Sequence, residues 1–459
     1  MPFAFLDREE EVARLRRLVA RRDGALGILY GRRRCGKSRL LREVLARCRP
    51  IFYVADDRES ALQRASLARE IARLVPGFDG VTYPEWSALF ARLWTEAQRG
   101  TVLALDEFPA LVAVAPEVPS LLQKHLDRDA RRGVHLLLSG SSQRMMQGLV
   151  FERTAPLYGR AVEILKVGPL AFGWIAKALG LTDPSSAVEA YAVWGGVPRY
   201  WELAAEHRSL AAAIRSLVLS PLGVLYDEPG GLLLDDLRDT TQASSILSLI
   251  GQGCHRLSEI AGRLGKPATS LSRPLQRLVE LGLVQREVPF GASTRDTKRT
   301  TYGVVDPFTS FWFRFVEPNR SRLEAGRLEA VAREVSARLA DHVARVWEEL
   351  ARASVPRLRA GGRSWGPAGR WWGPGRDRRP LEIDVVAESE DGTAVLLGEA
   401  KWSEQVDVAR LVDGLQRKAE RFPSRGRRAV VTALWLQRRP RGRVPAVVFT
   451  PSDVLRGLR

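Results

Sequence analysis

The sequence has few cysteines and no long apolar run. Its three cysteines, Cys35, Cys48 and Cys254, show no CxxC spacing, which argues against a disulfide framework or a cysteine-rich zinc site and fits a reducing cytoplasm. No stretch of about 18 apolar residues is present to span a bilayer. The N-terminal segment turns acidic from Asp7 and lacks the basic-then-apolar profile of a secretory signal. We therefore expect a cytoplasmic protein with no membrane partner.

Lysine is also scarce. Of 71 basic residues only 8 are lysines and 63 are arginines, which are spread along the whole chain, and the net charge is +18. This charge suits a polyanion partner such as DNA or RNA. A G+C-rich genome produces the same arginine bias, so charge alone leaves both explanations open.

The chain of 459 residues is longer than one hydrophobic core usually accommodates, so several domains are expected. In residues 1–170, short continuous apolar runs alternate with amphipathic stretches, which predicts a parallel sheet with crossover helices. Residues 361–379 are rich in Gly, Trp and Arg and predict irregular structure. The predicted divisions are a core at 1–170, a helical segment at 171–240, a winged helix at 241–305, a helical and aromatic connector at 306–345, and a C-terminal α/β domain at 346–459.

A phosphate-binding loop is the clearest motif. Residues 31–38 read GRRRCGKS, which matches G-x-x-x-x-G-K-S without a mismatch, between an apolar strand pattern and an amphipathic helix pattern. Gly31 and Gly36 let the backbone wrap with its N–H groups inward, at a helix N-terminus that favours phosphate. Lys37 is predicted to reach the β- and γ-phosphates, and the Ser38 hydroxyl to ligate Mg²⁺. Arg39, which follows, is included among the nucleotide-binding residues.

Two acids follow the next strong strand pattern, VLALDEF. Asp106 is predicted to bind the water shell of Mg²⁺, and Glu107 to polarise the attacking water. A later strand, VHLLLSGSS, ends at Ser139, which senses the γ-phosphate or, in the alternative interpretation, belongs to a serine-rich helix cap. Arg160 is a candidate arginine finger, although a surface role is an equally open interpretation in so arginine-rich a chain.

These motifs resemble, in their order, those of prokaryotic ATPases of the AAA+/STAND type, the archaeal-style ATPase family. The segments that carry the resemblance, within residues 3–305, are FLDREEEVARL, GRRRCGKS, VLALDEF, LLLSGSS, LYGRA and GGVPRY. The resemblance implies a three-layer α/β core with a small helical lid. It also implies that Phe5, Arg8 and Glu9 lie against the adenine and that Gly196 and Pro198 lie near the nucleotide. The alternative for the first box is a helix start capped by Asp7.

Residues 244–305 show a winged helix-turn-helix pattern. Three helical segments are followed by a hairpin whose tip carries Arg295, Lys298 and Arg299, and the third helix places Arg273 and Arg277 one turn apart. One use of such a module is DNA binding, with the third helix in the major groove and the wing on phosphate. The alternative is an intramolecular hinge or partner surface.

The C-terminal segment contains clustered carboxylates. Asp384 lies in one strand pattern, and Glu399 and Lys401 in the next. Strand residues two apart share a face, so Glu399 and Lys401 point together, and Asp384 on a neighbouring strand completes a site suited to Mg²⁺. The lysine is placed to orient or activate a water for attack on a phosphodiester.

This pattern resembles the PD-(D/E)xK nuclease family over residues 335–435. The resemblance implies a restriction-endonuclease-like α/β fold and assigns Glu348, on a preceding helix, as a further metal ligand. The proline that usually precedes the first acid is replaced here by Ile383. Members also keep this fold without cleavage, so catalysis and a non-catalytic role both remain open.

The sequence thus predicts a multidomain α/β protein that binds ATP and Mg²⁺, hydrolyses ATP, and acts on nucleic acid, with DNA favoured. The alternative is a slow ATP-dependent switch whose C-terminal domain is a partner-binding module. A protein partner or self-association is compatible with both interpretations.

Overall fold

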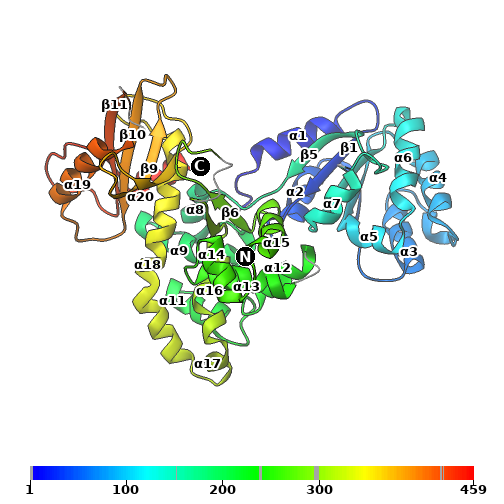
Figure 1. Ribbon diagram of the computed structural model, residues 1–459. Coiled ribbons are helices and arrows are strands. Elements are labelled where there is room, and N and C mark those ends of the chain that lie inside the picture. The colour runs from blue at the N-terminus through cyan, green and yellow to red at the C-terminus, as the bar shows by residue number, and fades with distance from the viewer. Residues whose placement is uncertain (1–3, 151, 237–239, 294–298, 424–425, 427) are drawn as a thin grey trace. The chain divides into compact units, whose positions relative to one another are not determined.

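The computed structural model describes residues 4–459 except 151, 237–239, 294–298, 424–425 and 427. The chain divides into two compact units: an N-terminal unit of residues 7–169 and 234–236, and a C-terminal unit of residues 1–6, 170–233 and 237–459 (Figure 1). Among the described residues, no helix has both the length and the apolar character needed to cross a membrane.

The N-terminal unit is built on a five-stranded sheet in the order β2-β3-β4-β1-β5, and every pairing is parallel. Its strands are β1 (Leu26–Tyr30), β2 (Arg49–Val54), β3 (Thr101–Asp106), β4 (His135–Gly140) and β5 (Ala161–Lys166). Every residue of β3 and β4 is buried, which explains their continuous apolar sequence. The predicted parallel sheet is confirmed.

Helices cover both faces of this sheet. Leu26 and Ile28 of β1 belong to a core that includes residues of α4 and α6, whereas Gly27 lies against Leu15 and Leu18 of α1. Because successive strand residues point to opposite faces, these contacts define three layers. The helices are α1 (Glu9–Val19), α2 (Lys37–Leu45), α3 (Ser60–Ala72), α4 (Trp86–Glu96), α5 (Phe108–Val114), α6 (Val118–Arg128) and α7 (Gln143–Val150).

The C-terminal unit begins with helices and continues into a winged helix. The first helices are α8 (Ile175–Leu179), α9 (Pro184–Trp194), α10 (Pro198–Ala205), α11 (Leu210–Ile214), a π-helical turn at Arg215–Leu219, and α12 (Glu228–Asp236). The winged helix consists of α13 (Thr240–Gly251), α14 (Leu257–Leu264), α15 (Ala268–Glu280), and the antiparallel strands β6 (Val284–Glu287) and β7 (Thr301–Val304). The predicted three helices and hairpin are therefore present; Arg295 and Lys298 at the hairpin tip lie outside the described residues.

A long helix joins the winged helix to the C-terminal sheet. After α16 (Pro307–Phe315) and α17 (Arg320–Glu324), α18 runs unbroken for 27 residues from Leu328 to Ser354. The boundary predicted at 345–346 thus falls inside a helix, because no glycine or proline interrupts it. One continuous hydrophobic core includes residues from α9, α16, α18 and the C-terminal sheet.

The C-terminal sheet is mixed, in the order β12-β11-β10-β9-β8, with β10, β11 and β12 parallel and β8 and β9 antiparallel to their neighbours. The segment predicted as irregular contains β8, which Trp371 anchors by its edge contact with Phe422. The elements are β8 (Gly369–Pro374), β9 (Pro380–Glu388), β10 (Ala394–Lys401), α19 (Val408–Arg421), β11 (Ala429–Leu436), β12 (Val447–Phe449) and α20 (Pro451–Gly457).

His342 on α18 makes the stability of this core depend on pH. Its side chain is buried, and Nε2 donates to the carbonyl oxygen of Ala192 at 2.8 Å. Burial, with smaller contributions from Arg314 and Arg345, lowers the pKa of His342 to about 4. The unfolded chain therefore binds a proton below its ordinary value of 6.5, while the folded chain does not, so stability falls as the pH drops from there towards 4.

We predict that this effect approaches roughly 3 kcal/mol at pH 4, at 1.36 kcal/mol per pKa unit. The measurement is denaturant unfolding of the wild type and of His342→Gln, which keeps a donor for Ala192, between pH 7.5 and 4. The free energy of unfolding of the wild type should decrease relative to the variant as the pH falls. A difference that stays constant with pH would contradict the assignment.

Candidate nucleotide site and a carboxylate–lysine cluster

The phosphate-binding loop connects β1 to α2 at the carboxyl edge of the sheet. Gly31 has φ 144°, and a side chain there would overlap the carbonyl oxygen of Val167. Gly36, at φ 90°, precedes the first residue of α2, and Arg34 also has a left-handed backbone at φ 66°. Alternation of such conformations turns successive N–H groups into one concavity, which suits an anion. The loop geometry therefore fits phosphate.

Lys37 lies at the base of this loop, with 4% of its surface exposed. Its ammonium donates to the carbonyl oxygens of Gly31 at 2.9 Å and Arg32 at 3.2 Å, and to Ser141 Oγ at 2.9 Å. Burial lowers the pKa of Lys37, and the nearby charges of Glu107, Cys35 and Asp106 oppose that shift. The ammonium group is thus held in the loop by neutral oxygens, which the oxygens of a bound phosphate can replace.

Strand β4 lies between β1 and β3 and links the loop to the acids. Asp106 ends β3 and is buried, and its Oδ1 accepts hydrogen bonds from Ser139 Oγ and from the N–H of Glu107. Glu107 has a left-handed backbone at φ 51°, a conformation that is costly for a residue with a side chain and is found mainly at functional sites. The predicted residues Lys37, Asp106, Glu107 and Ser139 all meet at this edge of the sheet.

Ser141 is the residue that sequence reasoning did not assign. Its Oγ lies 2.6 Å from Glu107 Oε1 and 2.9 Å from Lys37 Nζ, and its N–H donates to Glu107 Oε2 at 3.2 Å. One hydroxyl therefore connects the lysine of the loop to the acid. The motif LLLSGSS offers several serines, and only the strand geometry distinguishes Ser139, which bonds Asp106, from Ser141.

The other predicted nucleotide residues occupy separate places. Ser38 and Arg39 lie half-buried in the first turn of α2. Arg8 immediately precedes α1 with φ 74°, so the predicted cap by Asp7 is not formed, and its guanidinium bonds Glu11 and the carbonyl oxygen of Gly168. Phe5 belongs to the C-terminal unit. The contact of Phe5 and Arg8 with adenine stays a prediction.

Arg160, the predicted arginine finger, is engaged elsewhere. Its Nε and one terminal nitrogen each lie 2.9 Å from a carboxylate oxygen of Asp127 on α6. This bidentate ion pair is partly exposed, so it contributes little to stability. The charge of Arg160 is therefore compensated within its own unit, and a role as a finger stays a prediction.

The residues at the loop fit a nucleotide and Mg²⁺ by their chemistry. The loop supplies inward N–H groups and Lys37, and the hydroxyl of Ser38 and the carboxylate of Asp106 are oxygen donors of the kind that Mg²⁺ prefers. Glu107 is the other acid predicted at this edge of the sheet, and it lies beside these groups.

We predict that Ser141→Ala lowers kcat for ATP hydrolysis about tenfold and changes KM much less, because it removes the link between Lys37 and Glu107 rather than a phosphate contact. Steady-state kinetics measure both parameters. Ser141→Thr keeps the hydroxyl and should recover most of the rate. An equal loss in the alanine and threonine variants would mean that Ser141 acts through packing alone.

The second group of predicted residues lies in the C-terminal sheet. Asp384 on β9 and Glu399 on β10 are buried, and Lys401 Nζ lies 3.2 Å from Asp384 Oδ2 and 3.3 Å from Glu399 Oε2. The N–H of Ala400 also donates to Asp384 at 3.1 Å. A second lysine, Lys418 of α19, forms an ion pair with Glu399. The structure thus brings Asp384, Glu399 and Lys401 together as predicted and adds Lys418.

Glu348 on α18 lies near this group. Burial first, and then the charge of Asp384, raise the pKa of Glu348 to about 7, whereas Arg352 and Lys401 oppose the shift. In the part of the chain that the structure describes, no set of three or more His, Cys, Asp or Glu side chains is arranged to hold a metal ion. The oxygens of Asp384 and Glu399 are engaged by lysines instead. In this arrangement lysines contact the carboxylate oxygens that a metal would use, and the predicted metal site stays a prediction.

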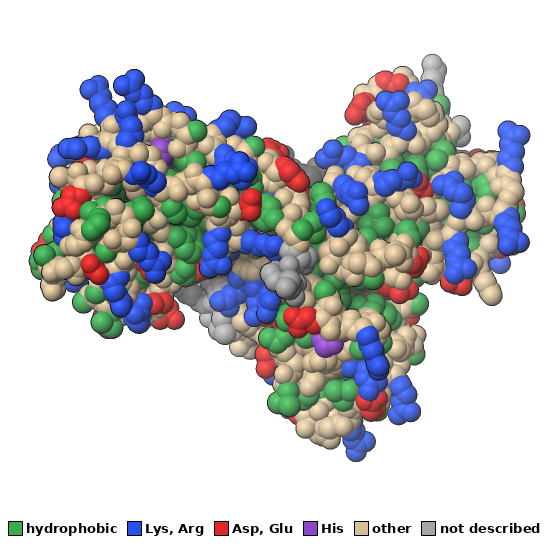
Figure 2. All heavy atoms as spheres, turned by 180° about the vertical axis from the view of Figure 1, so that it is seen from behind, with side chains coloured by type: hydrophobic (Ala, Val, Ile, Leu, Met, Phe, Trp, Pro, Cys, Tyr) green, Lys and Arg blue, Asp and Glu red, His purple; other side chains and the backbone are tan. Residues whose placement is uncertain are grey.

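The winged helix has an exposed surface on α15, and the chain after β6 is covered by the C-terminal sheet. On α15, Arg273 is exposed, and Arg277 pairs with Glu280 at 3.4 Å. By contrast, the chain that follows β6 is docked on β8: the N–H of Phe290 donates to the carbonyl oxygen of Arg370 at 2.9 Å, and the Phe290 ring packs on the core of the C-terminal sheet. Lys and Arg side chains are scattered over the visible face of the molecule rather than gathered in one patch (Figure 2).

Comparison with protein families gives three matches along the chain. Residues 5–202 match the family described as "ATPase domain predominantly from Archaea", residues 243–288 the "IclR helix-turn-helix domain", and residues 312–412 "Archaea bacterial proteins of unknown function". An uncharacterized protein of Methanocaldococcus jannaschii is 28% identical over 428 residues, which cover 91% of this chain and 92% of that protein.

Two solved structures also match. The Walker-type ATPase of Pyrococcus abyssi has a TM-score of 0.52 and 20% identity, and the match covers 68% of this chain and 96% of that chain. The ORC2 protein of Aeropyrum pernix, in its ADPNP–ADP complexes, has a TM-score of 0.43 and 18% identity, over 73% of this chain and 96% of that chain. The family models, together with the complete phosphate-binding loop on a parallel sheet, identify an archaeal-type ATPase domain at residues 5–202 and a helix-turn-helix domain at residues 243–288.

Proposed function

We propose that this protein is a Mg²⁺-dependent ATPase that couples its nucleotide state to the binding of nucleic acid, with DNA favoured. The observation that supports ATP hydrolysis is the chain of contacts from Lys37 through Ser141 to Glu107. It joins the group that binds phosphate to the acid that is placed to act on water.

The contacts suggest how these residues work. On nucleotide binding, Lys37 exchanges the carbonyl oxygens of Gly31 and Arg32 for phosphate oxygens, and Ser38 and Asp106 hold the metal. Mg²⁺, when bound, neutralises charge that develops on the phosphates. The bond between Ser141 and Lys37 then weakens, while the hydroxyl and the N–H of Ser141 still position Glu107, which can orient a water molecule and accept its proton.

For DNA we propose the exposed face of α15 rather than the wing. A recognition helix reads the major groove with its exposed polar side chains, and Arg273 is exposed on α15. Phe290, shortly after β6, is held on β8, so this part of the wing faces the C-terminal sheet, and the wing tip lies outside the described residues.

The experiment is ATP hydrolysis measured with and without duplex DNA, alongside duplex binding over a range of salt. The proposal expects ATP turnover and a steep decrease of affinity with salt. Arg273→Glu should weaken duplex binding, whereas Arg443→Glu, an exposed arginine at the far end of the chain, should not. ATP turnover without duplex binding at about 50 mM salt would instead support the switch that acts on a protein partner.

Cleavage of nucleic acid is a second candidate function, favoured by the contacts of Lys401 with both Asp384 and Glu399. We predict that any Mg²⁺-dependent cleavage is abolished by Asp384→Ala and by Lys401→Ala, with ATP hydrolysis nearly intact. Gel analysis of labelled DNA and RNA measures it. Cleavage that persists in both variants would reject this site, and the absence of cleavage in the wild type would favour a non-catalytic partner-binding module.

A further inference from the structure

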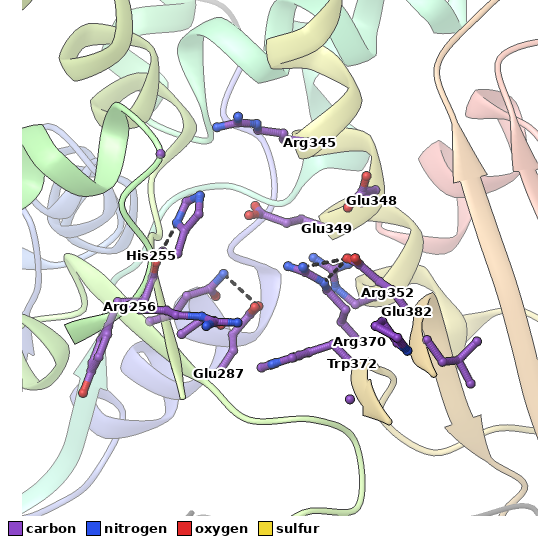
Figure 3. Close-up of a pocket in the computed structure, with 18 of the residues that line it drawn as sticks. His255, Arg256, Glu287, Arg345, Glu348, Glu349, Arg352, Arg370, Trp372 and Glu382 are labelled. Carbon is purple, nitrogen blue, oxygen red and sulfur yellow. Dashed lines mark hydrogen bonds and ion pairs between the residues drawn. The ribbon is translucent and has the colours of Figure 1, made fainter. Parts of the chain in front are cut away.

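A cleft of about 1140 Å³ lies within the C-terminal unit. The winged helix forms one wall, through the segment before α14 and the strands β6 and β7; α18 contributes a second, and β8 and β9 a third. Arg256 and Glu287 approach from the winged-helix side, and Arg352, Arg370 and Trp372 from the other (Figure 3). None of the functions assigned above uses this cleft as a whole.

Three of the arginines in the cleft have no ion pair among the residues that the structure describes. Arg256, Arg345 and Arg378 line it, and among the described residues none of the three guanidinium groups has an ion pair. Behind Arg345, one terminal nitrogen of Arg314 is buried without a hydrogen-bond partner. Burial, together with the charges of Arg345 and Arg338, lowers the pKa of Arg314 to about 10. Among the described residues, Arg256, Arg345 and Arg378 are thus cations of the cleft without a paired carboxylate.

The carboxylates of the cleft, by contrast, already have partners. Glu382 pairs with Arg370 at 2.6 Å, and Glu287 accepts a hydrogen bond from Gln285 at 3.2 Å. Glu259 accepts one from the backbone N–H of Arg256, also at 3.2 Å. The remaining two, Glu348 and Glu349, lie near the positive charge of Arg352. Burial raises the pKa of both to about 7, so at neutral pH they only partly offset the charge of the three unpaired arginines.

Trp372 adds a flat apolar surface to this charge. Its indole is half-buried in the cleft wall, and the guanidinium of Arg370 lies 5.2 Å from the ring centroid. An accessible aromatic ring beside unpaired arginines is the combination on which single-stranded nucleic acids bind, with bases stacked on the ring and phosphates on the cations. Bases in a duplex are already stacked and paired, so they do not offer a face to Trp372.

We propose that this cleft binds a single strand of nucleic acid, with a base on Trp372 and the backbone phosphates along Arg256, Arg345 and Arg378. The inference rests on the proposed function, because it specifies where and in which form nucleic acid is bound. An acidic peptide would satisfy the arginines equally well but leaves the indole face without a stacking partner.

The test is fluorescence anisotropy of a labelled oligothymidylate with the full chain at about 50 mM salt. Trp372→Ala should weaken binding about tenfold, consistent with the loss of one stacked base, and Trp372→Phe should restore most of the affinity. Arg345→Glu should also weaken it about tenfold. The matched control is Arg333→Glu, which reverses an exposed charge on the same helix, α18, outside the cleft, and should bind as the wild type does.

Three results would overturn the proposal. The first is an oligothymidylate affinity unchanged by Trp372→Ala and Arg345→Glu while duplex DNA still binds, which would leave the proposed function standing. The second is an equal loss in Arg333→Glu, which would mean that binding follows net charge. The third is binding of a polyglutamate peptide, but not of oligothymidylate, that Arg345→Glu abolishes. Failure of the proposed function itself is distinguishable, because ATP turnover and duplex binding would both be absent.

Discussion

Replacing Lys37 with alanine is expected to abolish ATP hydrolysis, with a loss of at least about 10²–10³-fold in kcat, the range found when one charge-stabilising donor is removed from an active site. Lys37 is the only lysine in the phosphate-binding loop, and its ammonium is held at the loop by Gly31, Arg32 and Ser141. Without it, no cation with the same reach is placed for the β- and γ-phosphates. Release of inorganic phosphate, together with binding of a fluorescent ATP analogue, measures both consequences.

The control for this variant is Lys124→Ala, which removes an exposed lysine from α6 of the same unit and should leave turnover unchanged. Unfolding curves of the two variants show whether the loss of turnover reflects the site or the fold. Turnover of Lys37→Ala at the wild-type rate would reject the central claim about this loop.

Replacing Glu107 with glutamine is expected to separate binding from hydrolysis. Glutamine keeps the size of the side chain and the ability to accept from Ser141, but it cannot take a proton from water. We therefore expect kcat to fall about 10²–10⁴-fold, the usual contribution of a general base, while the affinity for ATP changes little. Filter binding of labelled ATP and single-turnover kinetics measure the two quantities.

A matched change at the neighbouring position sharpens this test. Asp106→Asn should weaken the Mg²⁺ dependence of nucleotide binding, whereas Glu107→Gln should leave it as in the wild type. If Glu107→Gln hydrolyses ATP at an undiminished rate, the proton is accepted elsewhere and the role proposed for Glu107 is wrong.

The sequence predicted the loop and the acids because each depends on local order alone. A phosphate-binding loop consists of eight consecutive residues, and Asp106 and Glu107 come at the end of a buried apolar strand pattern. The prediction assigned Ser139 and left out Ser141, since the contacts of each depend on how β4 lies between β1 and β3. Residues two apart on a strand are equivalent in the sequence pattern, and only the structure shows that Ser141 reaches both Lys37 and Glu107.

In the C-terminal unit, the prediction of the site was limited because its residues come from segments that are far apart in the sequence. Asp384, Glu399 and Lys401 were predicted from one antiparallel pair of strands, whereas Lys418 comes from α19 and has no motif that marks it. The docking of Phe290 on β8 was also not predicted, because a ring in a loop gives no periodic signal. The boundary predicted at 345–346 falls within α18, which continues through that point.

The unbroken α18 limits where this protein can be divided into fragments. The helix spans roughly 40 Å at 1.5 Å per residue, and its side chains His342 and Trp347 bond to Ala192 and Trp435 respectively, on opposite sides of the predicted boundary. A fragment that starts at residue 346 would lose two thirds of this 27-residue helix and expose the apolar surface that the missing part covers. The sheet with its carboxylates and lysines is therefore not a detachable module, and any exchange of it between proteins has to carry the helix along.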